Sequence, residues 1–299
     1  MTVEFFVFGL VFGSFLNVCI YRMPRGLSVV RPRSACPSCH SPIAAYDNLP
    51  ILSWLILRGR CRRCKARISP RYAMVELLTG LFFALSWLAS AGSIVLAVKY
   101  CVFSFLLIGL IFTDAETKLL PDLLTKPGIG LGIVFSFFAP VEGPAEWLLS
   151  RWGTFDDRVF WVVNSVTGAV FGAAFILGVA MLYKVLRNIE GMGMGDVKLM
   201  ALIGAFLGIK LTLLVLLFGS VIGSVFGVVL MLTVWRKRLA RRRSRIEEPA
   251  GMARAQAWYS ARLIFRHLEI PFGVFLGTAA MFAAFWGMPL IRWYFGLYQ

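Results

Sequence analysis

Long apolar runs are the feature that most restricts what this chain can fold into. Several runs reach the roughly 20 residues that a helix needs to cross the hydrocarbon of a bilayer. Because lipid offers no hydrogen-bond partner to an open backbone, such runs are predicted to be helices. The composition agrees, since 59% of the residues are hydrophobic and only 15% are charged, against about 25% charged in a soluble domain. We therefore expect an all-α, polytopic membrane protein.

Eight runs are candidate spans. The sixth and seventh are separated only by Ile209 and Lys210, and the short sixth run is expected either to extend back through Gly195 or to be a half-helix. The first run has no basic region before it and no small-residue cleavage site after it, so we expect a membrane span rather than a removed signal peptide. The eight runs are Phe5–Tyr21, Ala73–Ala89, Ile94–Thr113, Gly128–Val141, Val159–Tyr183, Leu199–Gly208, Leu211–Val234 and Pro271–Leu290.

The positive charges predict an orientation. With eight alternating crossings, 26 of the 31 Lys and Arg residues fall on one side of the membrane, in the segments 22–72, 114–127, 184–198 and 235–270. This bias marks that side as cytoplasmic and places both termini outside. The net charge of +16 is then mainly a topology signal. It favours contact with anionic lipids over nucleic acid, for which the sequence has no recognisable module.

The same reading divides the chain into regions. Residues 1–21 form the first span, residues 22–72 a cytoplasmic lobe, and residues 73–299 a membrane core. The lobe is too short to build an apolar core of its own. Within the core, residues 235–270 are basic, and we expect a solvated linker that contacts lipid headgroups.

Four of the six cysteines lie in the lobe, as two Cys-x-x-Cys pairs with 21 residues between them. This spacing lets each pair supply two thiolates to one tetrahedral ion, so it predicts a structural Zn²⁺ site. Disulfides are the competing interpretation, but a reducing cytoplasm disfavours them. Four cysteines leave no open position for water, so a catalytic zinc is not expected. The four ligands are Cys36, Cys39, Cys61 and Cys64.

Ionisable residues mark the ends of two predicted spans on the cytoplasmic side. Asp114 and Asp122 follow the third span, and Asp196 and Lys198 lie where the sixth begins. Charges at such positions are costly and tend to be functional. Two carboxyl groups that come together can act as a unit, one taking a proton from water while the other protonates a carbonyl. The glycines before Asp196 permit an irregular backbone that a substrate can approach closely; they are Gly191, Gly193 and Gly195.

Taken alone, these residues fit a protease and an ion-coupled transporter about equally, because transporters also use membrane carboxylates. A third class is a non-catalytic assembly scaffold that uses the lobe for docking. A phosphate-binding loop is not supported, since no strand precedes the glycines and no Gly-Lys-Ser/Thr follows them.

Six stretches in order, spanning residues 13 to about 275, resemble the type IV prepilin peptidases, the GxGD class of membrane aspartyl proteases. The two longest departures from the family pattern are residues 142–158 and 235–270. The matching stretches are Gly13–Val18 with Tyr21–Pro24, the cysteine pairs with Asn48–Trp54, Ser69–Tyr72 with Glu76–Thr79, Asp114 to Asp122, Gly191 to Lys198, and Ile270–Gly273.

The resemblance implies that Asp114 and Asp196 are the catalytic pair. It implies a multi-pass protein of the bacterial inner membrane that cuts leader peptides of type IV prepilins or type II secretion pseudopilins at the cytoplasmic face. Members with a cysteine-bearing first loop resemble the bifunctional type, which then methylates the new N-terminal amine with S-adenosylmethionine. Glu76 is a candidate for the methyl-donor site. Supporting roles are expected for Asp122, Lys198, Gly193 and Gly195, with Lys198 either favouring the ionised form of Asp196 or reaching to headgroups.

Overall fold

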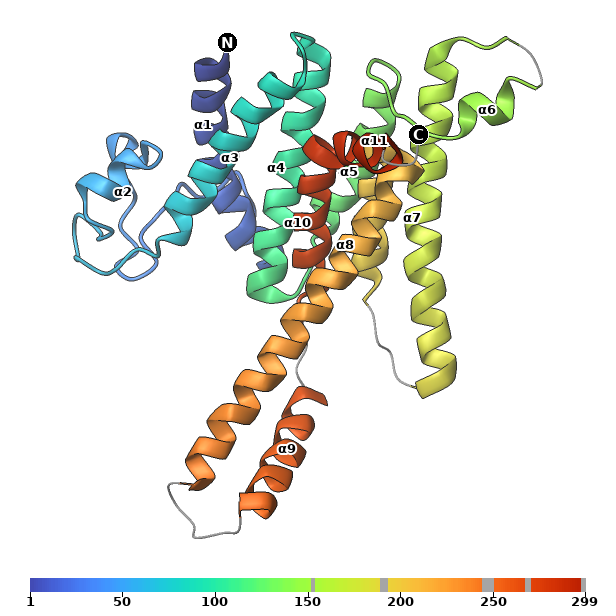
Figure 1. Cartoon of the computed structure of the whole chain (residues 1–299). Coiled ribbons are helices and arrows are strands. Elements are labelled where there is room, and N and C mark those ends of the chain that lie inside the picture. Colours follow the sequence, from blue (N-terminus) through green and yellow to red (C-terminus); the bar gives the residue numbers. More distant parts are fainter. Residues whose placement is uncertain (152–153, 189–192, 244–249, 267–269, 297–299) are drawn as a thin grey trace.

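The computed structural model describes residues 1–151, 154–188, 193–243, 250–266 and 270–296. This part of the chain is helical, with two isolated β-bridges in the lobe, which confirms the predicted all-α class (Figure 1). Six of its helical segments are long and apolar enough to cross a membrane. The helices are α1 (Thr2–Arg22), α2 (Leu52–Ile56), α3 (Arg71–Ala89), α4 (Ile94–Thr117), α5 (Asp122–Ser136), α6 (Ala145–Leu149), α7 (Asp157–Arg187), α8 (Met194–Arg243), α9 (Ala250–Arg266), α10 (Phe272–Phe282) and α11 (Met288–Gly296), with 3₁₀ turns η1 (Met23–Arg25) and η2 (Ala45–Asn48) and a π-helical η3 (Ala283–Gly287).

The predicted first, second, third and fifth spans coincide with α1, α3, α4 and α7. The fourth differs from the prediction of 128–141, because α5 begins at Asp122 and ends at Ser136. Asp122 lies in the first turn, where a negative charge suits the helix dipole, and the chain leaves the helix before Pro140, since a proline disfavours helix in the residue ahead of it. Hydropathy alone reports neither the helix-dipole effect at Asp122 nor the effect of Pro140.

The predicted sixth and seventh spans are joined in α8, which is broken at Gly208 (φ 73°, ψ 178°). The first part begins at Met194, so the sixth span extends back through Gly195, one of the two predicted alternatives. The break lies just before Ile209 and Lys210, which had been expected to separate the spans. A Cβ on Gly208 would lie 2.7 Å from the carbonyl oxygen of Glu142. Both the positive φ and this close approach therefore require glycine.

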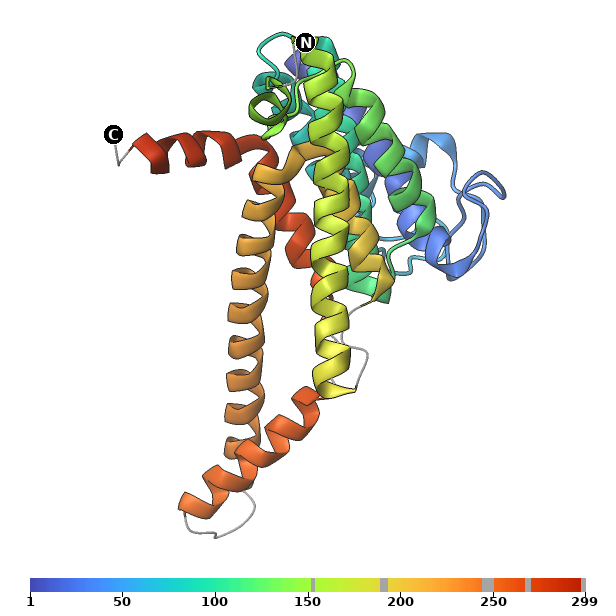
Figure 2. The ribbon, with the colours of Figure 1, turned by 90° about the vertical axis from the view of Figure 1, so that its right-hand side faces the viewer.

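The predicted eighth span, 271–290, is not one straight helix. A π-helical turn at 283–287 separates α10 from α11, and Figure 2 shows α11 turned aside from the bundle axis. Single π-turns commonly bend helices. The exposed side of α11 carries Trp293 and Tyr294, and Arg292 pairs with Glu142 at 3.4 Å.

The range 235–270, expected as a solvated linker, contains the end of α8 and the whole of α9. The two helices pack together and project beyond the bundle (Figure 1). Ala257 and Ala261 are buried, and the ring of Trp258 meets that of Trp235 edge-on at 6.3 Å. Alanine is the strongest helix former. The sequence interpretation did not predict a helix here because it considered mainly the charge of the range 235–270. Residues 244–249 and 267–269 lie outside the described residues.

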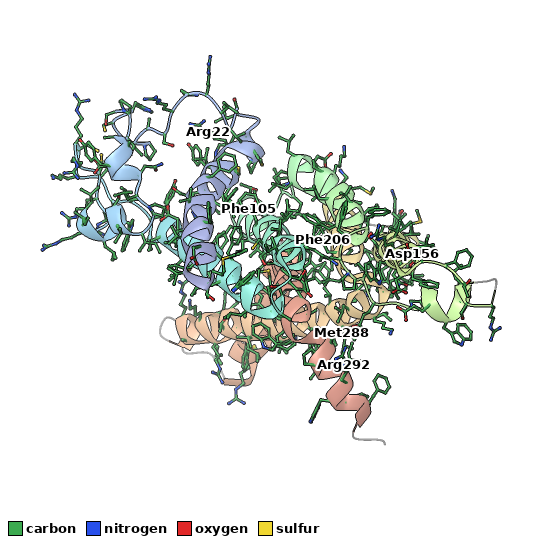
Figure 3. The ribbon with its side chains drawn as sticks, turned by 90° about the horizontal axis from the view of Figure 1, so that it is seen from above. Arg22, Phe105, Asp156, Phe206, Met288 and Arg292 are labelled. Atoms are coloured by element: carbon green, nitrogen blue, oxygen red, sulfur yellow. The ribbon has the colours of Figure 1, made fainter. Side chains whose placement is uncertain are left out.

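The core lies among α1, α4, α5, α8 and α10. Leu16, Leu107, Leu202 and Leu276 are fully buried there. The view from above shows Phe206 inside the bundle and places Arg22, where the lobe begins, far from Asp156, which precedes α7 (Figure 3). Because neighbouring helices alternate in direction, the end of α4 and the beginnings of α8 and α10 meet at one end of the bundle.

Candidate active site and metal site

Asp114 lies in the last turn of α4 and is buried, with 5% of its surface exposed. Its Oδ2 accepts a hydrogen bond from the backbone N–H of Val274 at 3.0 Å, and the N–H of Gly273 also contributes. Both donors belong to the beginning of α10, where N–H groups have no partner within the helix. The positive end of the α10 dipole thus faces this carboxylate and stabilises a negative charge on it.

Gly273 allows this contact. A Cβ at Gly273 would lie 2.8 Å from Oδ2 of Asp114, which is too close for any real side chain. The beginning of α10 can therefore approach the carboxylate only because position 273 has no side chain. The sequence interpretation used Gly273 as part of the family pattern but gave it no role in the site. The available signal was the Pro-Phe-Gly start of a helix at the same membrane face.

Asp196 lies in the first turn of α8 and is partly buried. Its own N–H bonds to the carbonyl of Gly193 at 3.2 Å. The Asp196 carboxyl lies within electrostatic range of Asp114, although 82 positions separate the two residues in sequence. Gly191, the first glycine of the predicted motif, lies outside the described residues.

Leu120 connects the two halves of this site. A Cβ added at Gly195 would meet Leu120 at 3.2 Å, and one added at Gly273 would meet it at 3.4 Å. Leu120 therefore contacts both the residue before Asp196 and the residue that faces Asp114. Its place in the loop between α4 and α5 gives the pair an apolar neighbour, which sequence reasoning did not single out.

Two of the predicted supporting residues, Asp122 and Lys198, pair with each other. Lys198 Nζ binds Asp122 Oδ1 at 2.5 Å, and Lys126 Nζ binds Asp122 Oδ2 at 2.7 Å. Asp122 thus joins the start of α5 to the start of α8. Lys198 thus forms an ion pair with Asp122, and the roles expected for it, toward Asp196 or the headgroups, stay predictions. Gly193 is exposed, and among the described residues a Cβ added there would meet only the Gly195 nitrogen, at 3.8 Å.

The four predicted cysteines come together in the lobe. One ligand atom from each lies within 4.8 Å of all the others, and the sulfurs of Cys36 and Cys64 are 3.8 Å apart. Tetrahedral zinc with Zn–S bonds of about 2.3 Å places its sulfurs about 3.8 Å apart. The cluster therefore fits a zinc ion, and all six cysteines of the chain are free thiols.

The two cysteine pairs have the same local structure. In each, the N–H of the first cysteine bonds to the carbonyl five residues on, Ser41 in one pair and Ala66 in the other, at 3.0 and 2.8 Å. The residue after the second cysteine has a left-handed backbone, with φ 54° at His40 and φ 60° at Lys65. His40 therefore has the same place in its turn as Lys65, and the ligand set is complete without it.

Local hydrogen bonds favour the thiolate form of one cysteine of the cluster. Hydrogen bonds from the side chain and backbone of Ser41 lower the pKa of the Cys39 thiol to about 6, and thiolates are the form that binds metal. Beside the cluster, Arg62 donates to both carboxylate oxygens of Asp47, at 2.6 to 3.0 Å. This hydrogen bonding lowers the pKa of Asp47.

Glu76 lies where the lobe meets α1 and α3. It is 9% exposed, and its Oε2 accepts the N–H of Ile51 at 2.7 Å, while Ser14 also bonds to it. Ile51 has φ 59°, a strained backbone for a β-branched residue. Nearby, Asn17 Nδ2 donates to the carbonyl of Tyr72 at 2.9 Å, and its buried Oδ1 has no partner among the described residues.

Arg71 links this junction to the carboxyl pair. It begins α3 directly after the lobe and forms an ion pair with Glu116, two residues beyond Asp114 on α4. Its Nε is buried and, within the described chain, unpartnered. The junction thus contains a buried carboxylate and two orphaned polar atoms, which is a donor and acceptor set suited to a polar ligand.

Comparison with known proteins covers nearly the whole chain. Residues 7–90 match the Bacterial Peptidase A24 N-terminal domain, and residues 101–228 match the Type IV leader peptidase family. Three similar curated proteins are each named prepilin leader peptidase/N-methyltransferase. The one from Aeromonas salmonicida is 34% identical over 315 residues, covering 97% of this chain and 92% of its own. The Neisseria gonorrhoeae protein is 36% identical, covering 75% and 80%, and the Myxococcus xanthus protein is 40% identical, covering 83% and 68%.

No solved structure matches this chain. The two matched regions divide it as the structure does, since the first contains α1, the cysteine lobe and α3, and the second contains both Asp114 and Asp196. The expected resemblance is confirmed at 34% identity over almost the full length. The chain therefore belongs to the type IV leader peptidase family.

Proposed function

We propose that this protein cuts the leader peptide from type IV prepilins or type II secretion pseudopilins and then methylates the new N-terminal amine. Family membership and the names of the curated relatives support both activities. The observation that supports the peptidase part is that Leu120 lies against both Gly195, the residue before Asp196, and Gly273, which faces Asp114 at the beginning of α10. Transporter and scaffold functions are not favoured by these relatives.

Hydrolysis follows from the difference between the two carboxyl groups. The N–H donors of α10 favour the anion on Asp114, so Asp196 carries the shared proton. Asp114 takes a proton from water, which attacks the scissile carbonyl carbon, while Asp196 gives its proton to the carbonyl oxygen. The tetrahedral intermediate then collapses, the C–N bond breaks, and a carboxyl proton passes to the leaving amine.

The positive charges support an orientation with this site at the cytoplasmic face of an inner membrane and both termini outside. The leader would then approach from the cytoplasm, and the apolar part of the substrate would remain in the bilayer. The exposed backbone at Gly193, just ahead of Asp196, suits the approach of an extended peptide. We assign Asp122, Lys126 and Lys198 to joining α5 and α8 behind the site.

The methyl-transfer activity belongs to the junction of the lobe with α1 and α3. S-adenosylmethionine supplies, when bound, an activated methyl group on a sulfonium ion. Glu76 would face positive charge or ribose hydroxyls, while Asn17 and Arg71 would use their unpartnered atoms on the amino-acid part of the donor. These residues bind and orient, because methyl transfer to a neutral amine requires mainly close alignment.

Zinc would be held by Cys36, Cys39, Cys61 and Cys64 and would stabilise the lobe rather than take part in either reaction. The lobe has few buried apolar residues of its own, so the ion would order the segments that present Ile51 to Glu76.

The decisive experiment incubates the purified protein in lipid nanodiscs with a full-length prepilin and labelled methyl donor, followed by mass measurement of the product N-terminus. The expected product lacks its leader and carries one added methyl group. A shortened product without the methyl group would leave a peptidase only. An intact substrate, with a folded zinc-loaded protein, would overturn the proposed function and reopen the transporter and scaffold hypotheses.

A further inference from the structure

The zinc lobe exposes a group of apolar side chains on and just before α2. Leu49, Leu52, Leu55 and Ile56 are 52%, 57%, 57% and 72% exposed. The spacing of three and four residues places Leu52, Leu55 and Ile56 on one side of α2, and Leu49 lies in the extended chain just before the helix. We call these four residues the α2 face. Adjacent exposed apolar residues in a small polar lobe indicate a binding surface.

A basic pocket opens in the same part of the lobe. It has a volume of about 440 Å³ and is lined by residues that include Trp54, Arg58, Arg60, Arg67 and Ser69. This size falls within the range of sites that bind small molecules and headgroups. Trp54 belongs to α2 and lines the pocket, so the pocket and the α2 face share a helix.

The pocket arginines are available for an anionic ligand. Residues 22–72 contain eleven Lys and Arg residues but a single acid, Asp47, and Arg62 already pairs with that acid at 2.6 Å. Among the described residues, no carboxylate pairs with Arg58, Arg60 or Arg67. Guanidinium groups form strong paired hydrogen bonds to phosphate.

The position of the lobe restricts the partner. Its ends continue into α1 and α3, two candidate membrane helices, so it cannot leave the bilayer surface. Figures 1 and 2 show the lobe alongside α1 and α3 instead of beyond their ends. An apolar helical face with arginines around it, held at this level, has the composition of segments that lie in the membrane interface.

We propose that the zinc lobe binds anionic phospholipid, with the α2 face in the boundary between headgroups and acyl chains and the arginine pocket around a lipid phosphate. The charge of the lobe and its tether to two spans favour a lipid over a soluble partner. Lipid binding would hold the lobe, and with it Ile51 and Glu76, at a fixed height beside the membrane. This inference depends on membrane placement and not on either proposed catalytic activity.

Photo-crosslinking tests the α2 face without altering charge. Benzoylphenylalanine replaces Leu55 or Ile56 in the full-length protein in phosphatidylglycerol nanodiscs, and it replaces Val30 as the control, an apolar lobe residue 79% exposed outside the α2 face. We expect lipid adducts by mass spectrometry at positions 55 and 56, several-fold above position 30. Equal adducts at all three positions, or none, would overturn the proposal, provided that each variant retains its zinc.

Lipid titration in detergent, followed by native mass spectrometry, tests the pocket. Arg58→Glu/Arg67→Glu should weaken phosphatidylglycerol binding by at least roughly 25-fold, since losing each basic residue costs about fivefold near anionic lipid and each new carboxylate adds repulsion. Arg31→Glu/Arg33→Glu, the same charge change at exposed arginines outside the pocket, should bind as the parent protein does. Equal losses in the two variants would reduce the effect to net charge and contradict a pocket.

Two competing ligands, inorganic phosphate and S-adenosylhomocysteine, test whether the arginine pocket binds something other than lipid. Inorganic phosphate should not displace the lipid at concentrations matched to it, because phosphate lacks the acyl chains that meet the α2 face. Displacement by phosphate would make the pocket a free-anion site, and displacement by S-adenosylhomocysteine would make it part of the methyl-donor site. Either result would overturn the lipid assignment, and neither would affect the test of leader cleavage.

Discussion

The carboxyl pair and the cysteine cluster are assembled in opposite ways. Asp114, Asp196 and Gly273 come from three helices far apart in sequence, and apolar packing among α4, α8 and α10 brings them together. The four cysteines come from two turns of identical local structure, held mainly by hydrogen bonds within each turn. The first site depends on the whole bundle, whereas the second depends on the lobe and its ion.

This difference predicts which changes disrupt each of the two regions. A change in the bundle that moves a helix end should disturb cleavage without touching the metal. Loss of the metal should unfold the lobe, because a unit with so few buried apolar side chains has little other source of stability. The variants below test whether the regions are separable, from the largest expected effect to the smallest.

Replacing either member of the carboxyl pair should separate leader cleavage most clearly from zinc binding and methylation. Asp114→Asn and Asp196→Asn should each lower cleavage by roughly a thousandfold, because the amide keeps the shape of the side chain but cannot exchange a proton. Zinc content and methylation of a peptide that already begins at the mature residue should be retained. Cleavage near the parent rate by either variant would remove that residue from the pair.

Removing the metal should affect the lobe and methylation more than leader cleavage. Cys36→Ser/Cys61→Ser should lose the bound zinc, of which we expect about one per chain, and the lobe should become sensitive to protease. Methylation of a pre-cut peptide should fall below detection, while cleavage by the bundle should fall less. Cys19→Ser/Cys101→Ser, two cysteines buried within spans, provides the matched control and should keep its zinc. Metal analysis without zinc in the reduced parent protein would contradict the site.

Gly273→Ala tests how the bundle holds Asp114. The new methyl group would collide with the carboxylate, since the contact is only 2.8 Å, and a displacement of about 1 Å costs roughly a hundredfold in rate. Gly178→Ala is the control, because position 178 in α7 has nothing within 4 Å. We expect its cleavage rate to equal that of the parent. Similar rates for both variants would show that α10 does not position Asp114.

The sequence predicted the local features better than the assembled ones. The cysteine cluster followed from spacing, whereas the catalytic roles of the two aspartates, inferred from charges at the ends of apolar runs together with the family pattern, stay predictions. The contact of Gly273 with Asp114 joins residues 159 positions apart, and no periodicity reports such packing. The break at Gly208 lies next to the boundary that the sequence predicted at Ile209 and Lys210, whereas the bend at 283–287 was missed because hydropathy records how apolar a segment is and not its direction.

The ion pair between Arg71 and Glu116 joins the two regions, so it should give the smallest effect. Its side chains are 14% and 32% exposed, and partly exposed pairs contribute about 0.5–1 kcal/mol. Glu116→Gln should therefore lower cleavage about two- to fivefold. Arg71→Gln should lower cleavage equally but raise the KM for the methyl donor further, since Arg71 is also assigned to that site.

In a double-mutant cycle, Arg71→Gln/Glu116→Gln should cleave no worse than either single variant. Additive losses would show that the two regions are not coupled through this pair. Recovery of cleavage but not of methylation by the exchange Arg71→Glu/Glu116→Arg would separate the structural role of the pair from donor binding.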